Sequence, residues 1–243
     1  MTTVVQFSGG IDSLVALWLT RAEPGVCALW VKTDAAYPDT QARVEAACKA
    51  AGVPLYIEFT KRDILEYGFP ADIVAVDFTP LGRYVCNTSG PIMQSYMECC
   101  SRGIWGPMRI RTQALGADVI VRGVKACDKR VVRFAPGSTI EGMRYDMPLY
   151  TWTPDDVLAF AKRECVQHIP PYYALGETTS HDCWDCTAYL DENAKRVANL
   201  PEDKKRVVQA RLRFIASAGR EAMSNLQQAG FATMPALTEE VTQ

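Results

Sequence analysis

The stretch Thr3-Val4-Val5-Gln6-Phe7-Ser8-Gly9-Gly10-Ile11-Asp12-Ser13 decides the fold of this chain. Its first part, Thr3–Phe7, is a short β-branched run of the kind that forms a buried strand. Leu14–Thr20 follows with apolar residues at helical spacing, which places the start of a helix near Asp12. Glycine tolerates positive φ and lets a backbone approach another group closely, so Ser8-Gly9-Gly10 suits the turn between them. The sequence thus predicts a strand, a tight turn and a helix.

The same alternation continues along the chain. Val26–Thr33 predicts a second buried strand, Asp39–Ala51 a helix closed by Gly52, and Pro54–Phe59 a third strand. Asp118–Arg122 is a further apolar run that fits a buried strand. Strands that alternate with helices are typical of a parallel sheet with crossover helices. We therefore predict an α/β fold, with a parallel sheet flanked by helices and a helical segment at the C-terminus.

Composition limits the function classes. The chain has 243 residues, is 48% hydrophobic and carries a net charge of −2, which allows one large α/β domain with a small appendage. This balance argues against a globally basic nucleic-acid binder. The sequence shows neither a signal-peptide pattern nor an apolar run of the roughly 20 residues that a membrane span needs. We expect a cytoplasmic protein with no membrane partner.

The predicted turn has the chemistry of a phosphate site. Backbone N–H groups at a helix N-terminus attract anions, and the hydroxyls of Ser8 and Ser13 add donors. Asp12 is expected to orient the loop or to help hold Mg²⁺. The loop lacks the lysine of a GxxxxGKS/T motif, which argues against the class that hydrolyses a γ-phosphate. The alternative is a plain strand–helix turn in which Asp12 only caps the helix.

Two cysteine pairs form the second motif. Cys99-Cys100 lies in Ile92–Leu115, which is expected to be mostly helical with interruptions at Gly103 and at Gly106-Pro107. Cys183-Trp184-Asp185-Cys186 is a CxxC, which brings two thiolates to one side of a turn, as Fe–S and Zn sites require. Adjacent cysteines suit the separate iron corners of a 4Fe–4S cluster better than one Zn²⁺, which stays the alternative. We predict these four cysteines as metal ligands.

The motifs resemble those of a known family. SGGxDS is the fingerprint of the PP-loop (ATP pyrophosphatase) superfamily, and Cys-Cys followed by CxxC is similar to the cluster pattern of its phosphoadenylylsulfate (PAPS) and adenylylsulfate (APS) reductases. Thr33-Asp34-Ala35-Ala36-Tyr37-Pro38-Asp39-Thr40 resembles the family's Asp-Thr-Gly…Pro-Glu-Thr stretch. Val121-Arg122-Gly123-Val124-Lys125 resembles its Thr-Gly-Leu-Arg loop.

The resemblance covers about residues 3–190 and implies a nucleotide-binding domain at 1–190 followed by a helical segment at 191–243. It also implies that ATP, APS or PAPS binds at the phosphate loop and the segments around it. The expected nucleotide-binding residues are Ser8, Gly9, Gly10, Asp12, Ser13, Asp34, Arg122 and Gly123.

The tail departs from the family pattern. Reductases of this family carry a catalytic cysteine near the C-terminus, whereas this chain has no cysteine after Cys186. One reading gives the role to Cys127, because Lys125, Lys129 and Arg130 would lower its pKa; the alternative is a spectator cysteine. The other reading is ATP-dependent, AMP-forming sulfur transfer, as in enzymes that thiolate tRNA or place phosphorothioates in DNA. A non-catalytic nucleotide-binding subunit is the third reading.

We expect Asp12, Lys125 and Cys127 as catalytic residues. Between Arg102 and Asp146, nine basic and four acidic residues give a local charge of +5, which fits an anionic nucleotide or a nucleic-acid backbone. The further partners expected are a thiol reductant or a sulfur-donor protein, and a second copy of the chain.

Overall fold

The structure is a computed structural model that describes residues 1–128, 135–177 and 180–229. Its chain forms two compact units that alternate along the sequence. The first comprises Met1–Arg62, Met97–Asp185 and Asp191–Leu200, and the second Asp63–Tyr96, Cys186–Leu190 and Pro201–Gln243. The division into a family domain at 1–190 and a segment at 191–243 stays a prediction.

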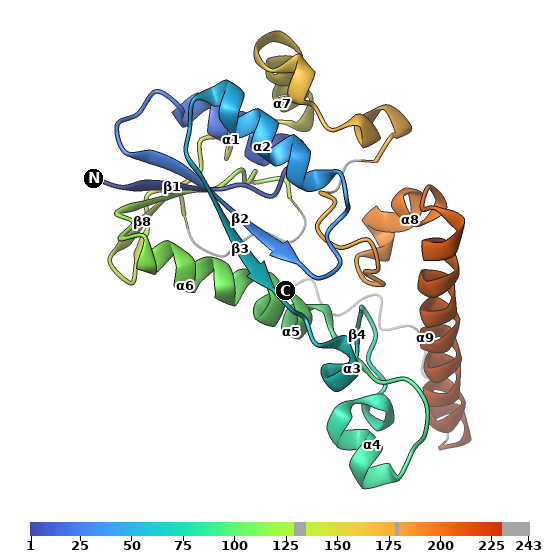
Figure 1. The fold of residues 1–243 in the computed structure, drawn as a ribbon. Helices are drawn as coiled ribbons and strands as arrows, with labels where there is room; N and C mark the ends of the chain where they lie inside the picture. The colour runs from blue at the N-terminus through green and yellow to red at the C-terminus, as the bar shows by residue number, and fades with distance from the viewer. Residues whose placement is uncertain (129–134, 178–179, 230–243) are drawn as a thin grey trace, which may run out of the picture. The chain divides into compact units, whose positions relative to one another are not determined.

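The first unit is built on a six-stranded sheet (Figure 1). Its strands run in the order β3-β2-β1-β6-β8-β7, all neighbours being parallel except β7 and β8. The expected α/β fold is thereby confirmed. The bounds are β1 Thr3–Gln6, β2 Val26–Thr33, β3 Leu55–Thr60, β6 Val119–Val121, β7 Thr139–Ile140 and β8 Met143–Asp146.

Helices cover both faces of this sheet (Figure 1). The helices α1 Ile11–Thr20, α2 Thr40–Ala51 and α7 Pro154–Glu164 lie on one face, and α6 Gly106–Ala114 on the other. Successive side chains of a strand point to opposite faces, so Val5 joins the core under α1 whereas Val4 joins the core under α6. α2 ends at Gly52, whose φ of 70° closes the helix as expected.

The predicted helix at 92–115 is divided. Met93–Ser95 forms strand β5, and the helical part begins with α5 Tyr96–Cys100. A π-helical turn, Ser101–Trp105, then separates α5 from α6. The expected interruption around Gly103 is therefore present as a π turn directly after the cysteine pair, a geometry that is frequent at functional sites.

The second unit holds a two-stranded parallel sheet of β4 Phe69–Ala71 and β5. It also contains α3 Ile64–Tyr67, a 3-10 turn at Val76–Phe78, α4 Pro80–Cys86 and the long helix α9 Glu202–Gln228. Phe69 and Met93 pack with Ala218 and Phe214 of α9. With α8 Leu190–Ala198, α9 confirms helices in the described part of 191–243. None of the described helices combines the length and apolar character that crossing a bilayer requires.

Candidate nucleotide site and cysteine motifs

The strand order places the phosphate loop at a switch point of the sheet. β1 is flanked by β2 on one side and by β6 on the other, and all three are parallel. Ligands of open α/β sheets bind at the carboxyl ends of strands where the order reverses. The loops that follow β1 and β6 meet there, so residues 8–13 and 122–128 share one site.

The phosphate loop opens the N-terminus of α1 to an anion. Gly9 has φ +79°, which favours glycine, and Gly10 is the N-cap in an extended conformation. No side chain caps α1, so the N–H groups of its first turn are left for a ligand. Ser13 Oγ donates to the carbonyl of Gly10 at 3.0 Å and lies 3.2 Å from Ser8 Oγ. Because the N-cap is Gly10, Asp12 is not the helix cap.

Asp12 instead binds the loop after β6. Lys125 Nζ lies 2.7 Å from Asp12 Oδ1 and 3.1 Å from Asp128 Oδ1. The backbone N–H of Lys125 also donates to Asp128 Oδ2 at 2.8 Å. Gly123 allows this approach, because a Cβ on it would lie 2.5 Å from the carbonyl carbon of Asp12. The structure therefore brings together Asp12, Gly123 and Lys125, which the sequence had placed at one site.

Burial shifts the pKa values of the ionisable groups at the switch point of the sheet. It lowers the pKa of Lys125, but hydrogen bonds to Asp12 and Asp128 raise it more, so the ammonium stays charged. Burial raises the pKa of Asp12, and Lys125 offsets only part of that rise. Arg122, at the end of β6, is half-buried, and the partial loss of hydration lowers the pKa of its guanidinium. A cation in a poorly hydrated site at the switch point is suited to an anionic ligand.

Two other predicted residues lie apart from this contact network. Asp34 follows β2, and its carboxylate binds Arg62. Cys127 is exposed, and the ammonium of Lys125 beside it is directed at two carboxylates. Lys129 and Arg130, which were expected to activate Cys127, lie outside the described residues. The roles assigned to Asp34 and Cys127 stay predictions.

The four cysteines predicted as metal ligands differ in their exposure and in their neighbours. Thiolate sulfur is the ligand that Fe–S clusters and structural zinc sites use, and Cys99, Cys100, Cys183 and Cys186 provide four such groups. Cys99 is buried and the other three are half-buried. Cys183 Sγ lies 3.2 Å from Thr33 Oγ1, at the end of β2. Among the described residues, no three His, Cys, Asp or Glu side chains are gathered as a metal site would need.

Arg62 is a residue that the sequence analysis missed. Its side chain is 2% exposed, and it binds two carboxylates, Asp34 at 2.7 Å through Nε and Asp185 at 2.8 Å through NH1. Gly103 packs on its stem, because a Cβ there would lie 2.5 Å from Arg62 Cγ. Thr60 Oγ1 donates to the carbonyl of Gly103 at 2.7 Å. Arg62 thus contacts both the CxxC motif and the π turn after Cys99-Cys100.

The CxxC turn has a second buried arginine. Arg196 of α8 is 3% exposed and donates to the carbonyls of Cys183 at 3.3 Å and Trp184 at 3.0 Å. The N–H of Trp184 donates to the carbonyl of Ala35 at 2.9 Å. The segment after residue 190 therefore supports the CxxC motif, although its sequence showed no recognisable chemistry.

An aromatic stack precedes the CxxC motif. The ring of His181 lies between Tyr37 and Tyr172, with centroid distances of 4.2 and 3.7 Å. Its Nε2 lies 2.5 Å from Glu177, which also accepts a hydrogen bond from Asn199. Burial lowers the pKa of His181 despite Glu177. The ring is thus fixed by the fold.

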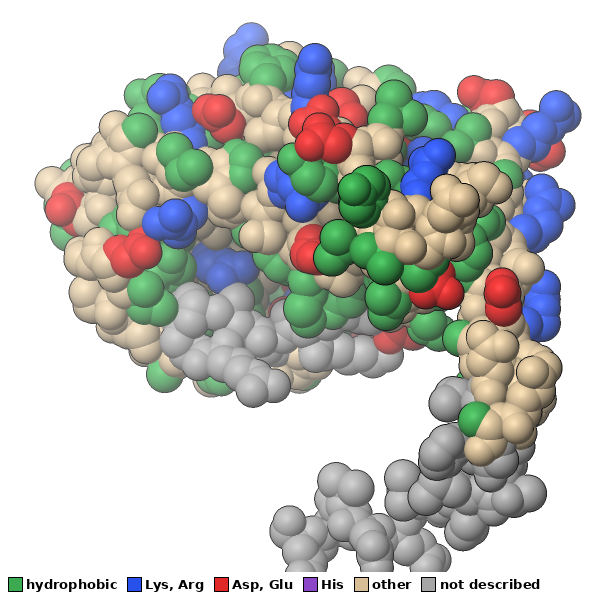
Figure 2. Space-filling view, turned by 90° about the horizontal axis from the view of Figure 1, so that it is seen from below, with side chains coloured by type: hydrophobic (Ala, Val, Ile, Leu, Met, Phe, Trp, Pro, Cys, Tyr) green, Lys and Arg blue, Asp and Glu red, His purple; other side chains and the backbone are tan. Residues whose placement is uncertain are grey.

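The basic segment is partly neutralised. Arg109 pairs with Glu141 at 3.1 Å, and Arg111 lies 3.8 Å from Glu58. Lys and Arg are interspersed with Asp and Glu on the face shown in Figure 2. Part of the positive charge that the sequence indicated is therefore paired with carboxylates, and Arg122 and Lys125 are the basic residues described at the switch point.

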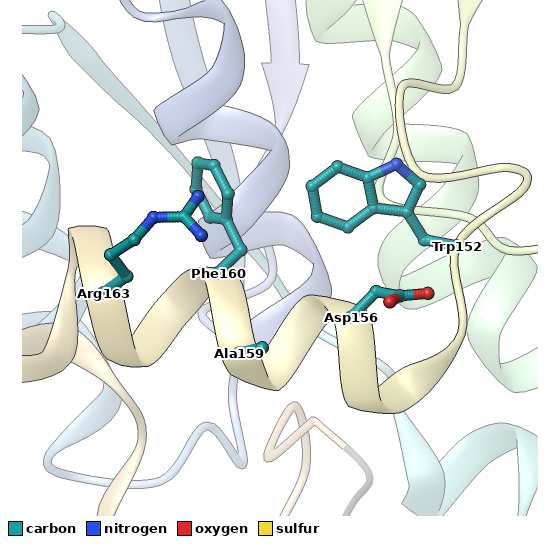
Figure 3. Close-up of a pocket in the computed structure, with 5 residues that line it drawn as sticks. All are labelled: Trp152, Asp156, Ala159, Phe160 and Arg163. Carbon is teal, nitrogen blue, oxygen red and sulfur yellow. The ribbon is translucent and has the colours of Figure 1, made fainter.

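A pocket of about 330 Å³ lies along α7 (Figure 3). Its charged groups are already engaged: the carboxylate of Asp156 accepts from Thr153 at the helix start, and Arg163 binds Glu164. Arg163 also lies over the ring of Phe160. None of its lining residues belongs to the phosphate loop or the cysteine motifs. The lining residues are Trp152, Asp156, Ala159, Phe160 and Arg163.

The fold and the loop at its switch point define an α/β protein of the PP-loop class. The phosphoadenosine phosphosulfate reductase domain matches residues 2–189, and the chain belongs to this family. No curated protein sequence matches the chain.

One solved structure supports the fold, and two others show a weaker likeness. The PAPS reductase from Candida auris in its phosphate complex is 14% identical, with a TM-score of 0.50 over 75% of this chain and 81% of that one. The U34-tRNA thiolase NcsA from Methanococcus maripaludis, solved with its 4Fe–4S cluster, is 15% identical, with a TM-score of 0.42 over 89% and 72%. A predicted subunit of tRNA methyltransferase from Methanocaldococcus jannaschii is 18% identical, with a TM-score of 0.37 over 67% and 74%.

Proposed function

We propose that the chain is an ATP-using, AMP-forming enzyme that transfers sulfur to an anionic acceptor such as a nucleic acid. The observation that carries this proposal is the uncapped start of α1 beside the Asp12–Lys125 pair, at the switch point of the sheet. This arrangement offers backbone N–H groups and one buried cation to a polyphosphate.

The proposed reaction has two steps. An acceptor oxygen attacks the α-phosphorus of ATP, the bond between the α-phosphorus and the bridging oxygen breaks, and pyrophosphate leaves. Sulfur from a sulfide-level donor then replaces the adenylated oxygen, which departs with AMP. The N–H groups of residues 11–13 and the hydroxyls of Ser8 and Ser13 would bind the leaving pyrophosphate. Lys125 would neutralise developing negative charge, and Asp12 would hold Lys125 in place or bind Mg²⁺.

A 4Fe–4S cluster on Cys99, Cys100, Cys183 and Cys186 completes the proposal. When bound, it would hold or activate the sulfur that is transferred. The thiol donor set supports iron over zinc, since adjacent cysteines strain a single tetrahedral ion. The proposal requires that the four thiols converge on one cluster in the loaded protein.

The second candidate is a PAPS or APS reductase with a displaced nucleophile. Family membership and the exposure of Cys127, in the same loop as Lys125, favour it. In this reaction the thiolate attacks the sulfonucleotide's sulfur, the S–O bond breaks and the nucleotide leaves, and an enzyme S-sulfonate remains. A thiol reductant then attacks this S-sulfonate, which releases sulfite and leaves a disulfide. The residues of the phosphate loop would bind the nucleotide in either reaction. The two candidates are therefore distinguished by which nucleotide binds, ATP for sulfur transfer and APS or PAPS for reduction.

Anaerobic purification tests the proposal directly. We expect about four irons per chain and little zinc, with a broad visible absorption band. Calorimetry should show binding of ATP, and pyrophosphate should be released when an acceptor such as unmodified tRNA and a sulfide donor are added. Binding of APS or PAPS without affinity for ATP would refute this function and favour the reductase. A nucleotide left intact with every acceptor would favour a non-catalytic subunit.

A further inference from the structure

Both cysteine motifs contact one buried side chain within the first unit. Gly103 lies in the π turn that follows Cys99-Cys100, and the stem of Arg62 passes where its Cβ would be. At the other end of the same arginine, NH1 binds Asp185, which lies inside the CxxC motif and is 4% exposed. A side chain from the end of β3 therefore links two motifs that are far apart in sequence.

The chemistry of this contact requires arginine. Nε and NH1 point in different directions of one rigid plane, and each binds a different carboxylate, Asp34 or Asp185. A lysine at this position would keep the charge but would offer one compact ammonium to two separated acceptors. Gly103 is equally specific, because any larger residue would displace the arginine stem.

The contact with Asp185 places the charge of Arg62 inside the CxxC motif. Burial lowers the pKa of Arg62, but the charge of Cys183 and the hydrogen bonds to Asp185 and Asp34 raise it well above its ordinary value. Thiolate ligands concentrate negative charge, and hydrogen bonds and charges next to them tune the reduction potential of a cluster.

We propose that Arg62 is the positioning residue of the cysteine motifs, which fixes the CxxC turn and the π turn in one arrangement and places a cation next to Asp185, inside the CxxC motif. The inference rests on the proposed function, because it assumes that these cysteines hold the cluster. The positioning itself is a property of the chain and can be measured without metal.

Hydrogen exchange on the full-length, metal-free protein tests the positioning. Arg62→Gln should speed amide exchange about tenfold in two segments, 99–105 and 182–185, with α7 unchanged. Arg62→Lys should give a smaller increase, and Gly103→Ala should reproduce the effect with the arginine still present. Arg109→Gln and Gly219→Ala are the matched controls, because Arg109 is a surface residue and nothing lies within 4 Å of a Cβ on Gly219. Unchanged exchange in all three Arg62 and Gly103 variants would overturn the proposal.

Iron content and reduction potential test the consequence. Arg62→Gln, purified anaerobically, should hold several-fold less iron per chain than the wild type, and its remaining cluster should have a more negative potential. Arg62→Lys should restore most of the potential, because it keeps the charge. A wild-type iron content and an unchanged reduction potential in Arg62→Gln would refute the role of Arg62 at the cluster. A wild-type protein without iron would instead refute the proposed cluster, while the exchange result would still decide the positioning. If Arg62→Gln does not fold, hydrogen exchange and the cluster measurements are made on Arg62→Lys and Gly103→Ala instead.

Discussion

The ammonium of Lys125 lies 2.7 Å from the carboxylate of Asp12. This contact joins the loop after β6 to the first turn of α1, so the two loops of the switch point form one rigid edge. Lys125 is 5% exposed and faces Asp128 as well, at 3.1 Å. A single cation therefore organises the candidate nucleotide site.

Replacing this cation should reduce both binding and stability. Lys125→Met would leave two partly buried carboxylates without a counter-ion, which should cost about 1–3 kcal/mol of the free energy of unfolding. Nucleotide affinity should fall by about tenfold or more, since a charge-assisted contact is lost. Urea unfolding and calorimetry with ATP measure the two effects. Adding Asp128→Asn should recover part of the stability but not the affinity; recovery of both would contradict a role in binding.

The same pair predicts an alkaline pH dependence. The pKa of Lys125 is raised above its ordinary value of 10.5, so the folded state holds the proton more tightly than the unfolded state. The resulting stability is fully present below the unfolded pKa and is lost as the pH rises through the folded pKa. The difference in unfolding free energy between wild type and Lys125→Met should thus be constant from pH 8 to about pH 10 and shrink above it. A difference that grows above pH 10 would refute the assigned charge state.

A methyl group at Gly123 should separate the two loops. Its Cβ would lie 2.5 Å from the backbone of Asp12, and the backbone cannot yield as a flexible side chain can. Gly123→Ala should therefore lower nucleotide affinity strongly and destabilise the first unit. Gly219→Ala is the matched control, since it adds the same methyl group in open space on α9 and should stabilise that helix by about 0.5–1 kcal/mol. Thermal unfolding and ATP titration of both variants compare their stability and affinity. Equal stability and equal ATP affinity of the two variants would exclude a close contact between the loops after β1 and β6.

Cys127 distinguishes the two candidate reactions. The proposed sulfur transfer does not use this exposed thiol, so Cys127→Ser should keep ATP-dependent pyrophosphate release within about twofold. A reductase would lose sulfite release from APS or PAPS in the same variant, because the attacking thiolate is gone. Assays of both products on one preparation decide between them. Sulfite release that survives Cys127→Ser would exclude Cys127 as the nucleophile.

Local signals explain how much of this protein could be predicted. The strand, glycine turn and helix around residues 3–20 are contiguous, and their apolar patterns identified β1, the loop and α1. Gly52 ends α2, as the sequence predicted from its tolerance of positive φ. The short strands β7 and β8 had no such signal, because Met143–Asp146 mixes exposed and buried side chains.

Contacts between distant residues could not be predicted. Arg62 lies between Lys61 and Asp63, which reads as a solvated charged turn, yet its partner Asp185 is 123 positions away. Arg196 was equally unpredictable. The sequence around it is that of a polar helix, whereas the fold buries its side chain against the carbonyls of the CxxC turn. The motifs thus predicted the candidate ligands, but the residues that hold these motifs in place depend on tertiary structure.

Arg196 leads to a prediction about the boundary after residue 190. If residues 1–190 were sufficient for the family domain, a chain ending at Leu190 would be as stable as one ending at Leu200. The structure predicts otherwise, because the shorter chain loses the hydrogen bonds of Arg196 to Cys183 and Trp184 and that of Asn199 to Glu177. Each buried bond to a charged group contributes about 1.5–3 kcal/mol, so the free energy of unfolding should differ by at least about 3 kcal/mol.

Both shortened chains lack α9, so its loss cancels in the comparison and the difference reports on residues 191–200 alone. Arg196→Gln in the full-length protein should reproduce about half of the effect, since the carbonyls of the CxxC turn keep one weaker donor. Urea unfolding followed by the fluorescence of Trp184 and the other tryptophans measures all three proteins. Equal stability of the two shortened chains would place the domain boundary at residue 190, whereas the expected difference makes α8 part of the site that holds the CxxC motif.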